Sequence, residues 1–175
     1  DDDLVKLFNP KLYGLFGRKH TSGMYWAPLI ALFSGAREAE ILQLERHDID
    51  QEDGIWVFEI KYHDYQTKEK IKRAKQKDSA RIVPIHDKLI ELGFIDYINT
   101  INEGRIFPDE PRKPNGKFDN FIKRFRNYRG ATGIKIDHDM QQKVFHTFRH
   151  TVRTRLKELK FDSKGNIQFD ESLID

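Results

Sequence analysis

The sequence of 175 residues contains no cysteine and no long apolar run. Without a thiol, the chain forms no disulfide and no thiolate metal site, and its composition fits a reducing, cytosolic compartment. No stretch approaches the roughly 18 apolar residues of a membrane-spanning helix, so we expect no membrane segment. Hydrophobic residues make up 38% of the chain and charged residues 34%, a balance typical of one globular domain with a core of its own.

Positive charge is concentrated in three segments, although the formal net charge is only +3. These segments are residues 68–77, 117–129 and 149–157, and the acidic residues collect elsewhere. Segregated positive charge favours a polyanionic partner such as DNA. Each run by itself is equally compatible with a solvated helix face, because surface lysines are common.

The hydrophobic pattern predicts a mainly α-helical domain with a small antiparallel β-sheet, which is an α+β fold. Helices are expected at residues 25–34, 38–45, 88–101, 117–128 and from 145 or 146 to about 159, and strands at 55–60 and 81–86. Pro28 suits the first turn of its helix. Residues 1–22 are expected to be irregular because of Asn9-Pro10 and two glycines, and Asp87 is expected to cap the helix that follows it.

The last predicted helix has two distinct faces. Its apolar stripe, which is expected to pack in the core, consists of Phe148, Val152, Leu156 and Leu159. A second stripe holds His146, Arg149 and Arg153 at i, i+3 and i+7. A helix with this pattern anchors itself by one side and presents an imidazole and guanidiniums on the other.

Arg37 follows a break of small residues, 34–36, between two apolar helices. Small residues let the backbone pack closely and direct one side chain into a cleft. Arginine forks bind phosphate oxygens and an imidazole moves a proton, so Arg37, His146 and Arg149 are predicted to converge on one phosphate. Glu40 either orients Arg37 or forms a weak surface pair with it. The alternative for the last helix is that Arg149 pairs with an internal carboxylate while His146 caps the helix.

His146 and His150 lie one helical turn apart, as in a zinc-binding helix. However, Thr147 stands where a metalloprotease needs glutamate, and Arg149 would place a cation beside the metal. We therefore expect no metal site.

Three segments, in this order, resemble the catalytic domain of phage integrases, the tyrosine recombinase family. Residues 34–44, SGAREAEILQL, resemble the first arginine box of that family. Residues 80–86, ARIVPIH, resemble the end of its small sheet, and residues 146–150, HTFRH, resemble its second box. The resemblance covers about residues 24–160.

The resemblance implies site-specific DNA strand exchange through a covalent 3′-phosphotyrosine, with no metal and no other cofactor. It implies that Arg37 and Arg149 clamp the scissile phosphate and that His146 assists proton transfer. It also implies that a lysine in the hairpin is the general acid for the 5′-oxygen. Lys75 aligns best with that lysine, and Lys77 is the alternative. The side chains expected to bind the DNA backbone are Lys68, Lys70, Lys72, Arg73, Lys77 and Arg153.

The sequence departs from the family pattern because no tyrosine follows Arg149. We therefore expect residues 1–175 to be a single catalytic core domain that lacks the N-terminal DNA-binding domain and the C-terminal tyrosine segment. Such a fragment would bind double-stranded DNA without cleaving it. The parent protein would integrate or excise a mobile element as a tetramer on DNA. It would be bacterial or phage-encoded, cytoplasmic and nucleoid-associated.

Two other functions remain open from the sequence. One is a non-catalytic DNA-binding protein built on a decayed recombinase fold. The other is an unrelated phosphate-binding enzyme with an arginine clamp.

Overall fold

The computed structural model describes residues 2–19, 21–61, 80–114, 116–134, 144–158, 160–161 and 167–168. Its helices are α1 (Asp2–Leu7), α2 (Pro10–Lys19), α3 (Ser22–Ser34), α4 (Glu38–Leu42), the 3₁₀ helix η1 (Arg46–Asp48), α5 (Asp87–Glu91), α6 (Phe94–Asn99), α7 (Asp119–Ala131) and α8 (Val144–Glu158). Its strands are β1 (Ile49–Glu52), β2 (Ile55–Ile60), β3 (Arg81–Pro84), β4 (Lys160–Phe161) and β5 (Ile167–Gln168). The predicted α+β class is therefore confirmed.

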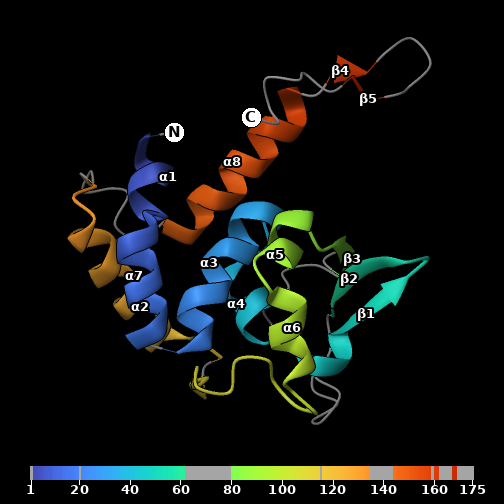
Figure 1. The fold of residues 1–175 in the computed structure, drawn as a ribbon, viewed down its shortest axis with the longest axis horizontal. Coiled ribbons are helices and arrows are strands. Elements are labelled where there is room, and N and C mark those ends of the chain that lie inside the picture. Colours follow the sequence, from blue (N-terminus) through green and yellow to red (C-terminus); the bar gives the residue numbers. More distant parts are fainter. Residues whose placement is uncertain are drawn as a thin grey trace.

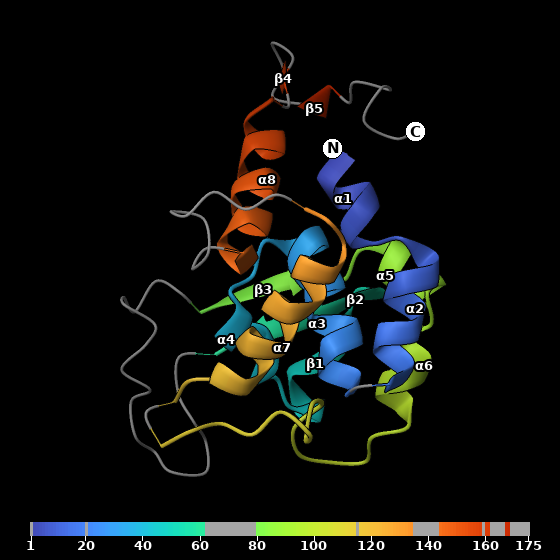
Figure 2. The ribbon, with the colours of Figure 1, turned by 90° about the vertical axis from the view of Figure 1, so that its left-hand side faces the viewer.

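Helix α3 occupies the centre of the domain, with the three-stranded sheet on one side and α1, α2 and α7 on the other (Figures 1 and 2). It contacts α2, α4, α7 and α8. Met24, Ala27, Ile30 and Ala31 are completely buried, as expected of a helix that is apolar around most of its circumference. Because α3 begins at Ser22, Pro28 lies inside the helix and not in its first turn as predicted.

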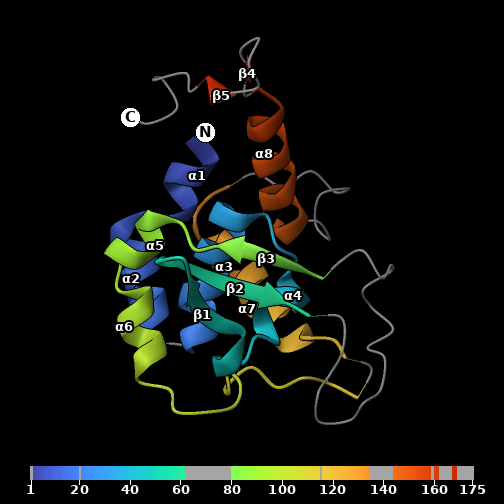
Figure 3. The ribbon, with the colours of Figure 1, turned by 90° about the vertical axis from the view of Figure 1, so that its right-hand side faces the viewer.

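The main sheet is antiparallel in the order β1–β2–β3, and Figure 3 shows it in front of α3. Phe58 in the middle strand is buried opposite Ile49 and Val83. Asp53 and Gly54, which join β1 to β2, both have positive φ angles of 50° and 81°, the conformation that favours an Asp-Gly hairpin turn. The predicted strand at 55–60 is confirmed, whereas the strand predicted at 81–86 ends at Pro84.

Aromatic side chains attach α8 to α7. Phe145 lies with its ring centroid 5.4 Å from that of Phe121 and 5.1 Å from that of Phe125, and Phe148 is buried beside it. The helix predicted at 117–128 is thus confirmed as α7, which begins at Asp119 and ends at Ala131. The apolar stripe predicted for α8 is wrong at Leu156, whose side chain is exposed at 59%, because the described part of α8 meets α3 only towards its start (Figure 1).

Asp2–Leu7 and Pro10–Lys19 are helical, where an irregular segment was expected at residues 1–22. Asn9 Oδ1 accepts hydrogen bonds from the backbone N–H groups of Lys11 and Leu12, at 3.1 and 3.4 Å, and Pro10 is the first residue of α2. An Asn-Pro pair therefore starts a helix here. The asparagine side chain caps free backbone N–H groups, and the N–H group that proline lacks would have no partner within the first turn.

The helix predicted at 88–101 is two helices, because Gly93 adopts a φ of 85° between α5 and α6. His86, and not Asp87, is the N-cap of α5, since its Nδ1 accepts from the N–H of Lys88 at 3.1 Å. The helix predicted at 38–45 ends at Leu42, and the carbonyl of Leu44 instead accepts a hydrogen bond from Ile106 N.

The second basic segment is divided between the surface and the interior. Lys123 and Arg126 are exposed on α7. Arg124 is half-buried and pairs with the fully buried carboxylate of Glu110, and Arg129 is buried. Only part of this segment is therefore available to a polyanion. Within the described residues, no helix is long and apolar enough to cross a membrane.

Candidate functional site

The turn after α3 is built from the small residues that the sequence singled out. Gly35 adopts a φ of 63° and its N–H donates to the carbonyl of Ala31 at 2.9 Å. The Ser34 hydroxyl donates to the carbonyl of Ile30 at 2.6 Å and accepts from the N–H of Ala36 at 3.1 Å. These bonds end α3 in a left-handed cap and place Arg37 at the start of α4.

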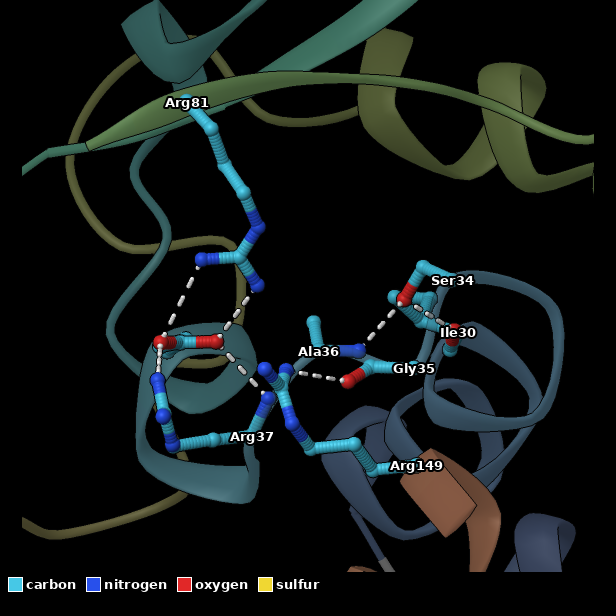
Figure 4. Close-up of polar contacts among 8 residues, drawn as sticks. Ile30, Ser34, Gly35, Ala36, Arg37, Arg81 and Arg149 are labelled. Carbon is cyan, nitrogen blue, oxygen red and sulfur yellow. Dashed lines mark hydrogen bonds and ion pairs between the residues drawn. The ribbon is translucent and has the colours of Figure 1, made fainter. Parts of the chain in front are cut away.

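Helix α8 lies directly against this turn. A Cβ atom on Gly35 would lie only 3.2 Å from Cβ of Val152, so the absence of a side chain lets the two segments approach. One turn earlier on α8, Arg149 donates from Nη1 to the carbonyl of Gly35 at 3.0 Å (Figure 4). The packing of α8 on the turn therefore brings Arg149 next to the segment that carries Arg37.

A buried carboxylate holds Arg37 in place. Glu40, exposed at only 8%, accepts from the Arg37 backbone N–H at 2.8 Å and from Arg37 Nη1 at 2.7 Å. The predicted Arg37–Glu40 pair thus exists. It is not a simple surface pair, because Arg81 also donates to Glu40, from Nη2 at 2.9 Å and from Nη1 at 3.5 Å (Figure 4).

The ionisation of these groups reflects their mutual contacts. Burial alone would raise the pKa of Glu40, but the hydrogen bonds from Arg81 and Arg37 outweigh it and hold that pKa below its usual value. Burial and the neighbouring charge of Arg37 lower the pKa of Arg149, while Glu40 opposes the shift and Arg81 and Arg153 add to it. A guanidinium remains charged at neutral pH despite such a shift.

The site therefore has more cations than anions among the described groups that act on Arg149. The cations among these groups are Arg37, Arg81 and Arg153, and the anion is the carboxylate of Glu40. The Arg37 side chain remains 48% exposed although it is paired. Two guanidiniums whose charges act on each other, one of them 48% exposed, offer forked donors for the oxygens of a phosphate.

The structure brings together some of the predicted residues and leaves others undescribed. Arg149 contacts the chain two residues before Arg37, at the backbone carbonyl of Gly35, where the alternative expected a carboxylate. Arg153 is exposed on α8. His146 lies in α8 one turn before Arg149, but its side chain is outside the described residues. The other predicted residues, also outside them, are Lys68, Lys70, Lys72, Arg73, Lys75 and Lys77.

Arg81 was not predicted to belong to this site. Its segment was singled out by resemblance, but nothing in the sequence indicates that a residue at the start of β3 would pair with a glutamate on α4. The described residues contain no group of three or more histidine, aspartate or glutamate side chains that would hold a metal ion.

Comparison with known families finds a match that runs through all the elements that build the site. The model of the phage integrase family matches residues 20–165, a range that includes Arg37, Arg81 and Arg149. Comparisons with curated proteins and with solved structures find no match. Since the family match covers well over half of the sequence, the chain belongs to the phage integrase family.

Proposed function

We propose that this domain holds one phosphate of double-stranded DNA between Arg37 and Arg149 for strand cleavage and rejoining by a site-specific recombinase. Membership of the phage integrase family implies site-specific recombination and DNA binding. The observation that carries the finer proposal is the contact of Arg149 Nη1 with the Gly35 carbonyl, 3.0 Å long. It fixes this guanidinium on the turn that leads into Arg37, whose own guanidinium is half-exposed and held by Glu40.

This arrangement suits the transition state of phosphoryl transfer. As a nucleophile attacks, the phosphorus becomes five-coordinate and its equatorial oxygens gain negative charge, which fixed cationic donors stabilise. The nucleophile is a tyrosine hydroxyl: its O–P bond forms as the bond from phosphorus to the 5′-oxygen breaks. His146 assists the proton transfer, and Lys75 or Lys77 gives a proton to the departing 5′-oxygen.

The clamp and the nucleophile come from different parts of the protein in this proposal. No tyrosine occurs between Arg149 and Asp175, so residues 1–175 are expected to bind DNA without forming a covalent adduct on a nicked suicide substrate. The domain would act within a tetramer on two duplexes, in the cytoplasm. The second candidate function is that of a DNA-binding protein on the same fold that performs no chemistry.

A transition-state mimic separates these two functions without requiring the tyrosine. Orthovanadate joins the 3′- and 5′-hydroxyls of a nicked duplex in a five-coordinate geometry, and an active site complementary to the transition state binds such a species more tightly. We expect vanadate to strengthen binding of nicked DNA by about tenfold or more in fluorescence anisotropy. Arg37→Ala should abolish this gain.

The matched control is Arg153→Ala, on the exposed side of α8. This variant should weaken binding with and without vanadate by a similar factor, because a backbone contact does not distinguish the two complexes. A wild-type chain that binds DNA equally with and without vanadate would refute the catalytic clamp and favour the non-catalytic function.

A further inference from the structure

The hydrogen bonds around Glu40 point to a role for Arg81. We propose that Arg81 is a positioning residue that acts through Glu40: it fixes the guanidinium of Arg37 in the orientation that the phosphate clamp requires. The inference rests on the proposed function of Arg37 and Arg149.

The first argument is the geometry of the Glu40 carboxylate. Oε1 accepts from Arg37 Nη1 at 2.7 Å and from Arg81 Nη1 at 3.5 Å. Oε2 accepts from the Arg37 N–H at 2.8 Å and from Arg81 Nη2 at 2.9 Å. A carboxylate offers about four acceptor sites, so these two arginines occupy all of them. Its plane cannot rotate without breaking contacts on both sides.

The second argument is the difference in exposure between the partners. The Arg37 side chain is 48% exposed, whereas that of Glu40 is 10% exposed and that of Arg81 is 32% exposed. An exposed guanidinium on a long side chain has many rotamers, and a fixed partner reduces that freedom. The more buried Glu40–Arg81 pair is therefore the support, and Arg37 is the group that it orients.

The third argument is electrostatic and agrees with the geometry. Among the hydrogen bonds and charges that oppose the effect of burial on the pKa of Glu40, the hydrogen bond from Arg81 is the largest. The hydrogen bond from Arg81 is therefore the largest single contribution to keeping Glu40 ionised, and an ionised carboxylate has acceptors only, as four bonds from two arginines require.

This contact also connects the clamp to the sheet. Arg81 is the first residue of β3 and lies opposite Ile60 in the sheet register. The Arg81–Glu40 contact thus joins the start of β3 to α4.

The test uses residues 1–175, nicked duplex DNA and orthovanadate. Arg81→Gln removes the charge and the fork, and we expect it to reduce the vanadate-dependent gain in affinity by about tenfold, since misplacing a transition-state donor costs at least this much. Affinity without vanadate should fall only about twofold, as for the loss of one distant cation. Arg81→Lys keeps the charge but not the bidentate fork, and its vanadate-dependent gain should lie between those of wild type and Arg81→Gln.

The matched control is Lys61→Gln, which removes a cation from the residue that follows β2 of the same sheet. Lys61 pairs with Asp48 at 2.5 Å and Glu59 at 3.3 Å, and its loss should leave the vanadate-dependent gain unchanged. Circular dichroism checks that each variant is folded. If Arg81→Gln does not fold, Arg81→Lys decides the question, and a gain equal to that of wild type contradicts the inference.

The outcomes separate this inference from the proposed function. If wild type shows the vanadate-dependent gain and folded Arg81→Gln shows the same gain, Arg81 does not position the clamp, although the clamp itself stands. If wild type shows no gain, the proposed function fails and the role of Arg81 fails with it.

Discussion

Arg149 and Gly35 are joined by a hydrogen bond from the guanidinium Nη1 to the backbone carbonyl oxygen, at 3.0 Å. The contact connects the last helix of the matched region with the turn after α3. Gly35 contributes to this contact in two ways. Its φ of 63° directs the carbonyl that accepts the bond, and its lack of a side chain leaves space for Val152. The position of Arg149, a candidate phosphate-binding residue, is thus set by the backbone geometry at Gly35.

Gly35→Ala should destabilise the domain by about 2 kcal/mol, measured by urea unfolding. The left-handed conformation alone costs a residue with a Cβ roughly 1–2 kcal/mol, and the new Cβ would also lie 3.2 Å from Cβ of Val152. In a Val152→Gly background all three contacting atoms of Val152 are absent, and the cost should fall towards the conformational part. An equal cost in both backgrounds would show that α8 does not press against Gly35.

Glu40→Gln should lower the free energy of unfolding by about 2 kcal/mol at pH 7, because it leaves a partly buried cluster of cations without its anion. The pKa of Glu40 is lowered in the folded protein, so its stabilising effect is present above its usual pKa near 4.5 and disappears as the pH falls through the folded value. The difference between wild type and variant should therefore shrink below about pH 4.5.

The control for this pH dependence is Glu91→Gln, in the exposed pair with Lys88. Its free energy of unfolding should differ little from that of wild type at pH 3 or pH 7, since exposed ion pairs contribute little to stability. A difference between wild type and Glu40→Gln that stays the same at pH 3 and pH 7 would contradict the role of the ionised carboxylate.

Arg129→Met should stabilise the domain. Arg129 is only 6% exposed, and its Nε and Nη2 atoms have no hydrogen-bond partner among the described residues. Burial and the neighbouring Arg126 lower its pKa. Replacing an unsatisfied buried cation with an apolar side chain of similar length should raise the free energy of unfolding by about 1 kcal/mol. Arg126→Met, on the exposed face, should have almost no effect, and a loss of stability in Arg129→Met would disprove this interpretation.

The sequence predicted the elements whose periodicity comes from a buried face. Phe118, Phe121 and Phe125 are spaced for a helix and are all buried. It failed where one residue decides between two structures. Asn9 and Pro10 start a helix by capping, although the same pair often breaks one, and the glycine at 93 divides a continuous apolar pattern into two helices.

The candidate site was predictable in its residue types but not in its connections. The small residues at 34–36 indicated the turn, and the spacing on the last helix indicated that Arg149 would face away from Phe148. The contact between Arg81 and Glu40 joins residues on a strand and a helix that are far apart in sequence. No local pattern encodes such a pair, because it depends on how the sheet packs beside α4.

DNA affinity should fall steeply with salt, because bound lysine and arginine side chains release condensed counterions. Lys123 and Arg126 are exposed on α7. Replacing both with glutamine should reduce the slope of log affinity against log salt by about 2. Lys88→Gln, in the exposed pair with Glu91 on α5, should leave the slope unchanged. An unaltered slope in the double variant would exclude this face of α7 from the interface.

The most direct test of the clamp is a double-mutant cycle on Arg37 and Arg149 in the vanadate assay with nicked DNA. Two groups that hold one phosphate act as a unit, and their losses are strongly non-additive. We predict that Arg37→Ala and Arg149→Ala each remove nearly all of the vanadate-dependent gain in affinity, and that the double variant loses no more. Two partial losses that multiply in the double variant would mean that the two guanidiniums act independently, and would contradict a shared phosphate.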